Sequence, residues 1–107
     1  MIFIDRRDAR PVTLRHASTF LQAVAHPIRL QILDAVRVEP ATVGAIVERL
    51  GLEQPVVSRH LAVLRRGAIV SVRAEGRERV YAIGDRRVHQ LLDVLFIPTD
   101  PNVGEAA

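Results

Sequence analysis

The sequence predicts an α+β fold that is mainly helical, on three observations. Apolar residues recur at spacings of three and four in five separate stretches, as on the inward faces of amphipathic helices. Gly51 separates two of these stretches by a very short turn, which is typical of a helix-turn-helix unit. Two β-rich runs then flank Glu75 and Gly76, as in a β-hairpin. Four helices, a hairpin and a final helix together indicate a winged helix-turn-helix domain.

The chain starts with a short charged segment, followed by the first predicted helix. For residues 1–11 two interpretations are open: a solvated tail that packs its apolar start on a partner, which we favour, or a mobile arm that touches phosphates. The helix is expected from about Val12 to Ala25. Its apolar face is wider than one small core needs. That face consists of Leu14, Ala17, Leu21 and Val24, with Phe20 beside them.

The second and third helices have recognisable starting residues. Proline is tolerated in a first helical turn, so a helix is expected from Pro27 to about Val38, with Arg29 and Arg37 facing outward. Thr42 has the side chain of an N-cap for the short helix before the glycine turn. The apolar stripe of that short helix consists of Val43, Ile46, Val47 and Leu50.

The fourth predicted helix begins near Glu53 and has two unlike faces. Val57, Leu61 and Leu64 are spaced by four and three residues, which stacks them on one side, toward a core. The other side carries amide, hydroxyl and guanidinium groups, which pair with base edges and phosphates in a major groove. We therefore interpret this segment as a recognition helix. The predicted DNA contacts on it are Gln54, Pro55, Ser58, Arg59, His60 and Arg65.

The hairpin and the last helix complete the predicted domain. Arginines near the hairpin tip indicate a wing that lies along a DNA backbone, through Arg73, Arg77 and Arg79. A final helix is expected from about Asp85, which is placed to cap it, to Phe96. The chain is thus divided into an N-terminal arm at 1–11, a DNA-binding domain at 12–96 and a disordered tail at 97–107.

Length, charge and cysteine content limit the function classes. The 107 residues form one domain, and the 15 basic residues, all arginine, outnumber 12 acidic ones, which favours a polyanionic partner. The absence of cysteine excludes disulfides and thiolate metal sites. The N-terminus is too short and too soon charged for a signal sequence, and no apolar run approaches a membrane span. We expect a soluble cytoplasmic protein without a membrane partner.

The apolar faces of the first and last helices indicate a homodimer. A domain of this size buries one shared core, so these faces are best explained by pairing with the same helices of a second copy. A two-fold dimer sets two recognition helices about one duplex turn, ~34 Å, apart. The expected partner is therefore double-stranded DNA carrying an inverted repeat.

Three segments of the chain match a known family. They read Ala25-His-Pro-Ile-Arg-Leu-Gln-Ile-Leu33, Val56-Val-Ser-Arg-His-Leu-Ala-Val-Leu-Arg-Arg-Gly-Ala-Ile-Val70 and Glu75-Gly-Arg-Glu-Arg-Val-Tyr-Ala-Ile83. In this order they resemble the ArsR/SmtB family of bacterial winged-helix repressors. The resemblance implies a dimeric transcriptional regulator that an inducer releases from its operator or tunes. It also implies that Gln54, Ser58 and Arg59 face bases, and that Arg77 and Arg79 take phosphates or the minor groove.

The metal-sensing residues of that family do not carry over. Thr42 and Gly44 stand where members that bind thiophilic metals have cysteines. Arg87, two residues after Asp85, stands where other members have a histidine. An unusual nickel, zinc or cobalt site at the dimer interface is an open alternative. Its candidate ligands are His16, His89, Asp85 and Asp93. We favour ordinary helix positions for both histidines, because no tight ligand spacing occurs. For His26 and His60 we favour structural or phosphate-contacting roles.

Two further function classes have less support in the sequence. Ser58 and His60 are two residues apart on a helix and diverge by about 200 degrees, so they form no nucleophile and base pair, and an enzyme is not expected. The winged helix could instead serve as an interaction module for a second regulatory protein. Such a module would not need four arginines on one surface, Arg59, Arg73, Arg77 and Arg79.

Overall fold

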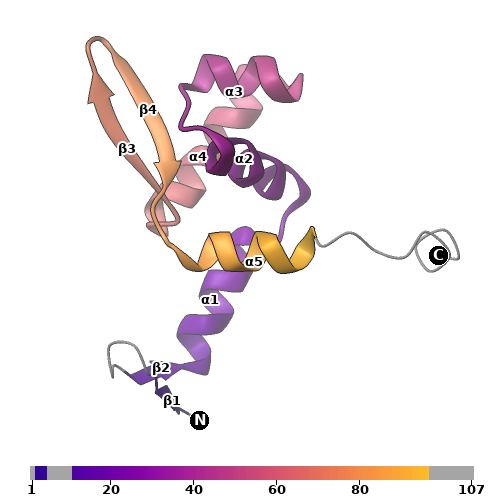
Figure 1. Cartoon of the computed structure of the whole chain (residues 1–107), viewed down its shortest axis with the longest axis vertical. Coiled ribbons are helices and arrows are strands. Elements are labelled where there is room, and N and C mark those ends of the chain that lie inside the picture. Colours follow the sequence, from indigo (N-terminus) through magenta and orange to yellow (C-terminus); the bar gives the residue numbers. More distant parts are fainter. Residues whose placement is uncertain (1, 5–10, 97–107) are drawn as a thin grey trace, which may run out of the picture.

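The computed structural model of the chain describes residues 2–4 and 11–96. In these residues five helices and two small antiparallel sheets follow one another (Figure 1). They are β1 (Ile2–Ile4), β2 (Pro11–Thr13), α1 (Leu14–Val24), α2 (Pro27–Val38), α3 (Val43–Leu50), α4 (Gln54–Arg66), β3 (Val70–Glu75), β4 (Glu78–Ile83) and α5 (Arg87–Leu95). The predicted fold class, a winged helix-turn-helix, is confirmed.

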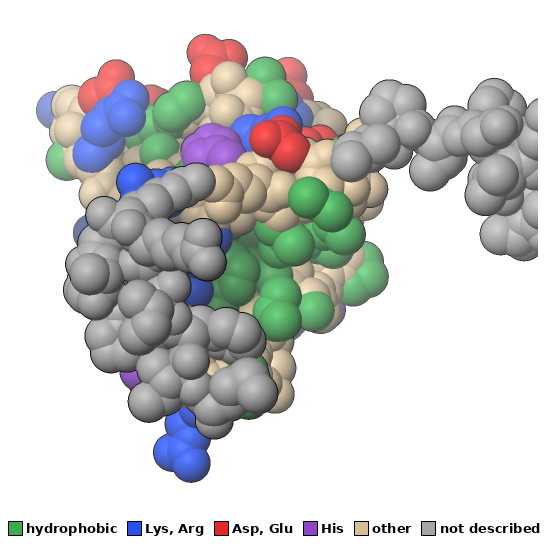
Figure 2. Space-filling model, turned by 60° about the horizontal axis from the view of Figure 1, so that its bottom comes forward, with side chains coloured by type: hydrophobic (Ala, Val, Ile, Leu, Met, Phe, Trp, Pro, Cys, Tyr) green, Lys and Arg blue, Asp and Glu red, His purple; other side chains and the backbone are tan. Residues whose placement is uncertain are grey.

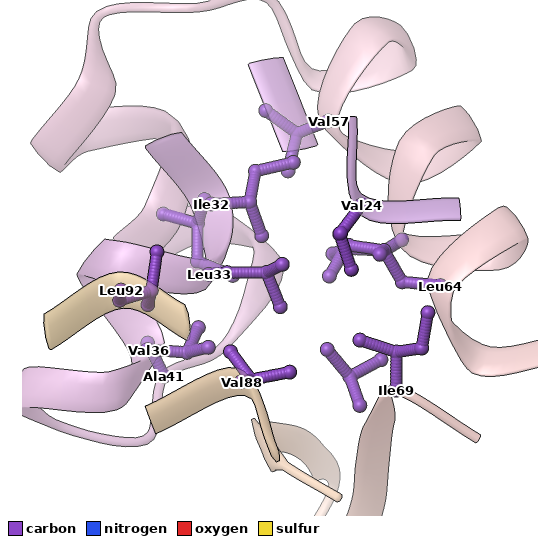
Figure 3. Packing of buried hydrophobic residues seen from close by; sticks show 13 residues of the cluster. Val24, Ile32, Leu33, Val36, Ala41, Val57, Leu64, Ile69, Val88 and Leu92 are labelled. Carbon is purple, nitrogen blue, oxygen red and sulfur yellow. The ribbon is translucent and has the colours of Figure 1, made fainter. Parts of the chain in front are cut away.

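One hydrophobic core lies where α2, α3 and α4 meet. Ile32 and Leu33 of α2 are fully buried against Val57 and Leu64 of α4, and their side chains point toward one another (Figure 3). α5 crosses this core and adds Val88 and Leu92, whereas α1 contributes Val24 alone as a buried residue. The three predicted inward residues of α4, Val57, Leu61 and Leu64, are all buried. The three-and-four spacing therefore gave the correct core face of the recognition helix.

Local capping sets the helix boundaries. The Thr42 hydroxyl accepts a hydrogen bond from the backbone N–H of Ala45 at 3.2 Å, which confirms Thr42 as the N-cap of α3. Gly51 ends α3 with φ of +66°, a left-handed conformation that glycine adopts without steric cost. At α1 the prediction is corrected: the helix starts at Leu14 rather than Val12, because Thr13 is extended and caps it.

The wing is a two-stranded hairpin tied to the start of α3. β3 pairs with β4 from Val70 opposite Ile83 to Glu75 opposite Glu78, which leaves a two-residue loop that starts at Gly76. Gly76 has φ of +62°, as two-residue hairpin turns require. At the other end of the wing, Ala41 and Tyr81 exchange two backbone hydrogen bonds of 2.8 and 2.9 Å. The hairpin is therefore fixed to the helix-turn-helix.

Two short strands precede α1. Ile2–Ile4 pair antiparallel with Pro11–Thr13, so the last residues before α1 belong to a short sheet. These strands were not predicted, because a pairing of three residues leaves no alternating pattern. The predicted disordered tail, 97–107, lies outside the described residues. The division of the chain into arm, domain and tail stays a prediction.

Candidate nucleic-acid interface

The outward face of α4 is the polar surface that the sequence predicted. Gln54, Pro55, Ser58, Arg59 and Arg65 are all exposed, opposite the buried side of the same helix. Pro55 lies in the first turn, where its missing N–H removes no intrahelical bond. The groups on this face donate and accept hydrogen bonds in the patterns that base edges offer. One side of a single helix thus presents an amide, a hydroxyl and guanidinium groups to solvent.

The arginines of this face take part in none of the ion pairs found among the described residues. Among described residues, the four ion pairs join Arg37, Arg49, Arg73 and Arg87 to carboxylates. None of these pairs involves Arg59 or Arg65 of α4, or Arg77 and Arg79 of the wing. An exposed guanidinium without a carboxylate partner in its own chain is available to an external phosphate or guanine.

The wing divides its arginines between two faces. Successive side chains of a strand point to opposite sides, and Arg73 lies opposite Val80 while Arg79 lies opposite Ala74. Arg73 and Arg79 therefore project from opposite faces of the hairpin. Arg73 also donates to the Glu75 carboxylate at 2.9 Å. The expectation that all three wing arginines share one surface is corrected, and Arg77 in the loop is the one at the tip.

His60 does not lie on the outward face. Its side chain is only 7% exposed, and its Nδ1 accepts a hydrogen bond from Arg29 Nε at 3.2 Å. Its ring packs against that of His26, with the ring centroids 4.5 Å apart. Burial lowers the pKa of His60 below 6.5, and the nearby His26, Arg29 and Arg59 lower it further. The prediction that His60 contacts DNA is corrected, because its side chain is buried. Structural or phosphate-contacting roles were expected for His26 and His60, and in the structure both make contacts within the fold.

Comparison with known proteins assigns this arrangement to a family. The model of "Bacterial regulatory protein, arsR family" matches residues 26–72, from the start of α2 into β3. The crystal structure of NolR from Sinorhizobium fredii superposes with a TM-score of 0.71 at 34% identity, over 80% of this chain and 92% of that one. The chain belongs to the ArsR family. A solved "homodimeric winged helix-turn-helix DNA-binding domain" from Mycobacterium bovis has a TM-score of 0.70 and 30% identity, over 87% of this chain and 83% of that one.

The curated relatives of this ArsR-family chain include a protein named as a transcriptional regulator. The HTH-type transcriptional regulator NmtR of Mycobacterium tuberculosis is 50% identical over 78 residues, which are 72% of this chain and 63% of NmtR. The nodulation protein NolR of Rhizobium meliloti is 38% identical over 74% of this chain and 65% of that protein. The matched part of the chain thus spans less than two thirds of these relatives. In the part of the chain that the structure describes, no helix is both long and apolar enough to cross a bilayer.

A second surface, on α1 and α5, is apolar instead of cationic. Large hydrophobic side chains are exposed on these two helices and gather on the face that Figure 2 turns toward the reader. They are Leu14 and Leu21 of α1 with Val94, Leu95 and the following Phe96 at the end of α5. Exposed apolar area of this kind marks an interaction surface. It lies on the helices that the sequence predicted to form the dimer.

The candidate metal ligands are not brought together in one chain. Asp93 is paired with Arg37 across α2 and α5, and Asp85 accepts hydrogen bonds from the Arg87 guanidinium and backbone N–H. Burial raises the pKa of Asp85, but the Arg87 hydrogen bonds outweigh it and lower the pKa below 3.8. His16 and His89 are exposed. Within residues 2–4 and 11–96, no three His, Asp or Glu side chains are grouped to hold a metal ion.

Three residues near the interface were not among the predicted DNA contacts. Ala62 and Arg66 are exposed on α4, four and eight residues after Ser58, which is the spacing of a shared helix face. That spacing was readable in the sequence. Arg29 was expected to face outward, yet it is half-buried and donates to His60 and to the Ala23 carbonyl. No local pattern could reveal this, because both acceptors belong to other helices.

Proposed function

We propose that this chain is a sequence-specific DNA-binding transcriptional regulator, in its simplest form a repressor that acts in the bacterial cytoplasm. The observation that carries the proposal is the outward face of α4. Ser58, Arg59 and their neighbours are exposed on it, Arg59 and Arg65 have no ion pair with a described residue, and the loop arginine of the wing, Arg77, offers a further phosphate contact. Of the two sides of α4, only this exposed side can enter a major groove, because the other side is buried in the core.

A homodimer is part of the proposed mechanism. The exposed apolar side chains of α1 and α5 support it, and so does the homodimeric state named for the related Mycobacterium bovis domain. Two chains related by a two-fold axis present two copies of α4 ~34 Å apart, which is one turn of the duplex. The proposed target is therefore an inverted repeat, with one half-site for each chain.

A metal-responsive regulator is the second candidate. A relative with the name "Probable mercury resistance operon repressor" from Streptomyces lividans is 38% identical over 68% of this chain, which keeps metals among the candidate signals. This chain has no cysteine, so the ligands would be His16 and His89 from two subunits, with nickel or zinc as the ion. Titration calorimetry of the dimer with Ni²⁺ and Zn²⁺ tests it, and absence of binding heat for both ions contradicts it.

Operator selection from random duplexes tests the leading proposal. The dimer is incubated with a pool of random DNA at about 150 mM salt, and bound molecules are sequenced and then footprinted. An enriched inverted repeat, bound at least about 1,000-fold more tightly than random duplex, is the expected result. Equal affinity for all duplexes at every salt concentration would overturn the proposal.

A further inference from the structure

The recognition helix carries a buried imidazole on its core side. His60 follows Val57 by three residues and precedes Leu64 by four, so it belongs to the same face as these buried residues. A buried imidazole must have its polar atoms paired, since an unpaired one costs free energy. His60 is also the buried polar side chain nearest in sequence to Ser58 and Arg59. The hydrogen-bond partner of His60 therefore affects the orientation of the outward face of α4, which we call the reading face.

That partner, Arg29, joins three helices. From α2, its Nε donates to His60 Nδ1 on α4 at 3.2 Å, and its Nη1 donates to the Ala23 carbonyl of α1 at 3.1 Å. The Ala23 carbonyl lies in the last turn of α1, where the helix dipole favours a cation. α1 places only Val24 in the core. The guanidinium is thus a polar connection between a helix of the proposed dimer interface and the recognition helix.

The neighbouring histidine packs against this cluster. His26 Nδ1 accepts a hydrogen bond from the backbone N–H of Ile28 at 3.1 Å, which caps α2, and its ring packs on that of His60. His60 Nδ1 likewise accepts a hydrogen bond, from Arg29 Nε. An imidazole nitrogen that accepts a hydrogen bond carries no hydrogen, so the ring hydrogen of His60 is assigned to Nε2.

We propose that Arg29 is a positioning residue for DNA binding, which acts through His60 to fix the orientation of α4 relative to α1. The inference rests on the proposed function, because a dimer reads two half-sites only when both α4 helices are held at the duplex repeat. α1 carries part of the proposed dimer surface, so a change in the angle between α1 and α4 changes the distance between the two reading faces. Arg29 strengthens operator binding without touching DNA.

Protonation of His60 breaks this connection. The charged and titratable groups that act on His60 are Arg29 and His26 from the side of α2 and Arg59 on α4, while α1 offers the Ala23 carbonyl to Arg29. A protonated Nδ1 would face the Arg29 Nε–H, donor against donor. Burial and these neighbours keep the folded pKa of His60 below 6.5. The contribution of the Arg29–His60 hydrogen bond to operator affinity is therefore complete above pH 6.5, and it is lost as the pH falls through the pKa of His60 in the folded protein.

The direction of this pH dependence is diagnostic. A fall in pH adds positive charge to a protein, which by itself raises the affinity for DNA. Protonation of His60 acts in the opposite direction, because it releases the recognition helix. Operator affinity is expected to fall between pH 7 and pH 5, by about tenfold, the size of one charge-assisted hydrogen bond.

Operator affinity of the full-length protein across this pH range tests the proposal. Arg29→Gln is expected to bind the operator about tenfold more weakly at pH 7.5 and to lose most of the pH dependence. His60→Gln keeps an acceptor for Arg29 but does not titrate. It is expected to bind the operator like wild type at pH 7.5, and its operator affinity should stay constant down to pH 5. Arg49→Gln is the matched control, since Arg49 bonds Glu39 and two carbonyls away from α4. Equal losses for Arg49→Gln and Arg29→Gln would overturn the proposal.

A measurement on the free protein separates this inference from the proposed function. Nitrogen-15 NMR of the His60 ring should show the Nε2–H tautomer and a pKa below 6.5 that rises in Arg29→Gln. An Nδ1–H tautomer or an unperturbed pKa overturns the link, whatever the protein binds. If the link is seen but wild type selects no operator, the proposed function fails and the positioning role fails with it. If circular dichroism shows that Arg29→Gln is unfolded, Arg29→Lys, which keeps the charge but not the planar fork, takes its place.

Discussion

The outward face of α4 and the outward faces of α1 and α5 are both exposed, but their chemistry is opposite. On α4 the exposed groups are polar, and Arg59 and Arg65 have no ion pair with a described residue. On α1 and α5 the exposed groups include large hydrophobic side chains such as Leu21 and Leu95. One surface is complementary to a polyanion, and the other to a second apolar surface.

The difference shows that exposure alone does not identify a binding site. The informative observation is an exposed group of side chains that lacks complementary partners among the described residues. Arg37 and Arg49 are also arginines near the surface, but each is paired with a carboxylate and a carbonyl of its own chain. Val38 is also a hydrophobic residue at 81% exposure, but it stands at the end of α2, where it lines a pocket with Arg49 and Leu50 of α3. Single residues of this kind are normal on any protein surface. Three experiments test whether the two surfaces differ in the way proposed, and two further substitutions test the junction between α4 and the wing.

The largest effect is expected from charging the apolar surface. The double substitution Leu21→Asp with Leu95→Asp places carboxylates in the proposed dimer interface, where burying them unpaired is costly. Sedimentation should show monomers, and operator affinity should fall at least about 100-fold, because each chain then reads one half-site alone. Val38→Asp is the matched control and should change neither. A double variant that remains dimeric would show that the interface lies elsewhere.

The next effect concerns the reading face of α4. Arg59→Ala removes an exposed guanidinium that is proposed to read a base, so operator affinity should fall by about 1–3 kcal/mol, or roughly 5- to 150-fold. Binding to random duplex should fall much less, and fluorescence anisotropy on both duplexes measures the ratio. Arg49→Ala, whose guanidinium is held by Glu39, serves as control. The same loss on both duplexes would assign Arg59 to phosphate contact only.

The wing offers a comparison within one hairpin. Arg77→Ala should weaken binding severalfold on every sequence and reduce the slope of log affinity against log salt by about one. Arg73→Ala should have a smaller effect, because Arg73 lies on β3 and its guanidinium is bonded to Glu75. Anisotropy titrations at several salt concentrations give both slopes. Equal slopes for the two variants would contradict the assignment of Arg77 to the DNA-contacting tip.

The smallest effect is a stability change at the junction of α4 and the wing. Ala68 has φ of +56°, in a C-terminal motif where the N–H of Ile69 bonds the Leu64 carbonyl at 2.9 Å. Glycine adopts this conformation without the Cβ clash, so Ala68→Gly should raise the free energy of unfolding by about 0.5–1 kcal/mol in a urea titration. Operator affinity should not change, because no reading group moves.

Gly84→Ala should change the free energy of unfolding in the opposite direction at the same junction. A Cβ on Gly84 would stand 3.0 Å from the Ala68 carbonyl oxygen and from the Val70 carbonyl carbon, both backbone atoms that cannot give way cheaply. This variant should therefore lower the free energy of unfolding. A neutral Gly84→Ala together with a destabilising Ala68→Gly would contradict the strained geometry.

Signals that act within a few residues were readable from the sequence. Pro27, Thr42 and Gly51 set helix boundaries through their own backbone preferences and hydrogen bonds, and the structure places all three boundaries as expected. The spacing of Val57 and Leu61 likewise predicted the buried side of α4. That same spacing includes His60, and the inference failed there because a polar residue type was given more weight than its position on the helix.

The sequence by itself determined the order of the elements, the apolar faces and the presence of a polar outward side on α4, because each depends on residues a few positions apart. Only the tertiary structure decided which arginines are already paired. Arg29 reaches an imidazole 31 residues away and Arg37 a carboxylate 56 residues away, and neither partner can be found from local spacing. A guanidinium is flexible and long, so its partner depends on which helices pack together. Pairing across the fold therefore separates the arginines that hold this protein together from those left for its ligand.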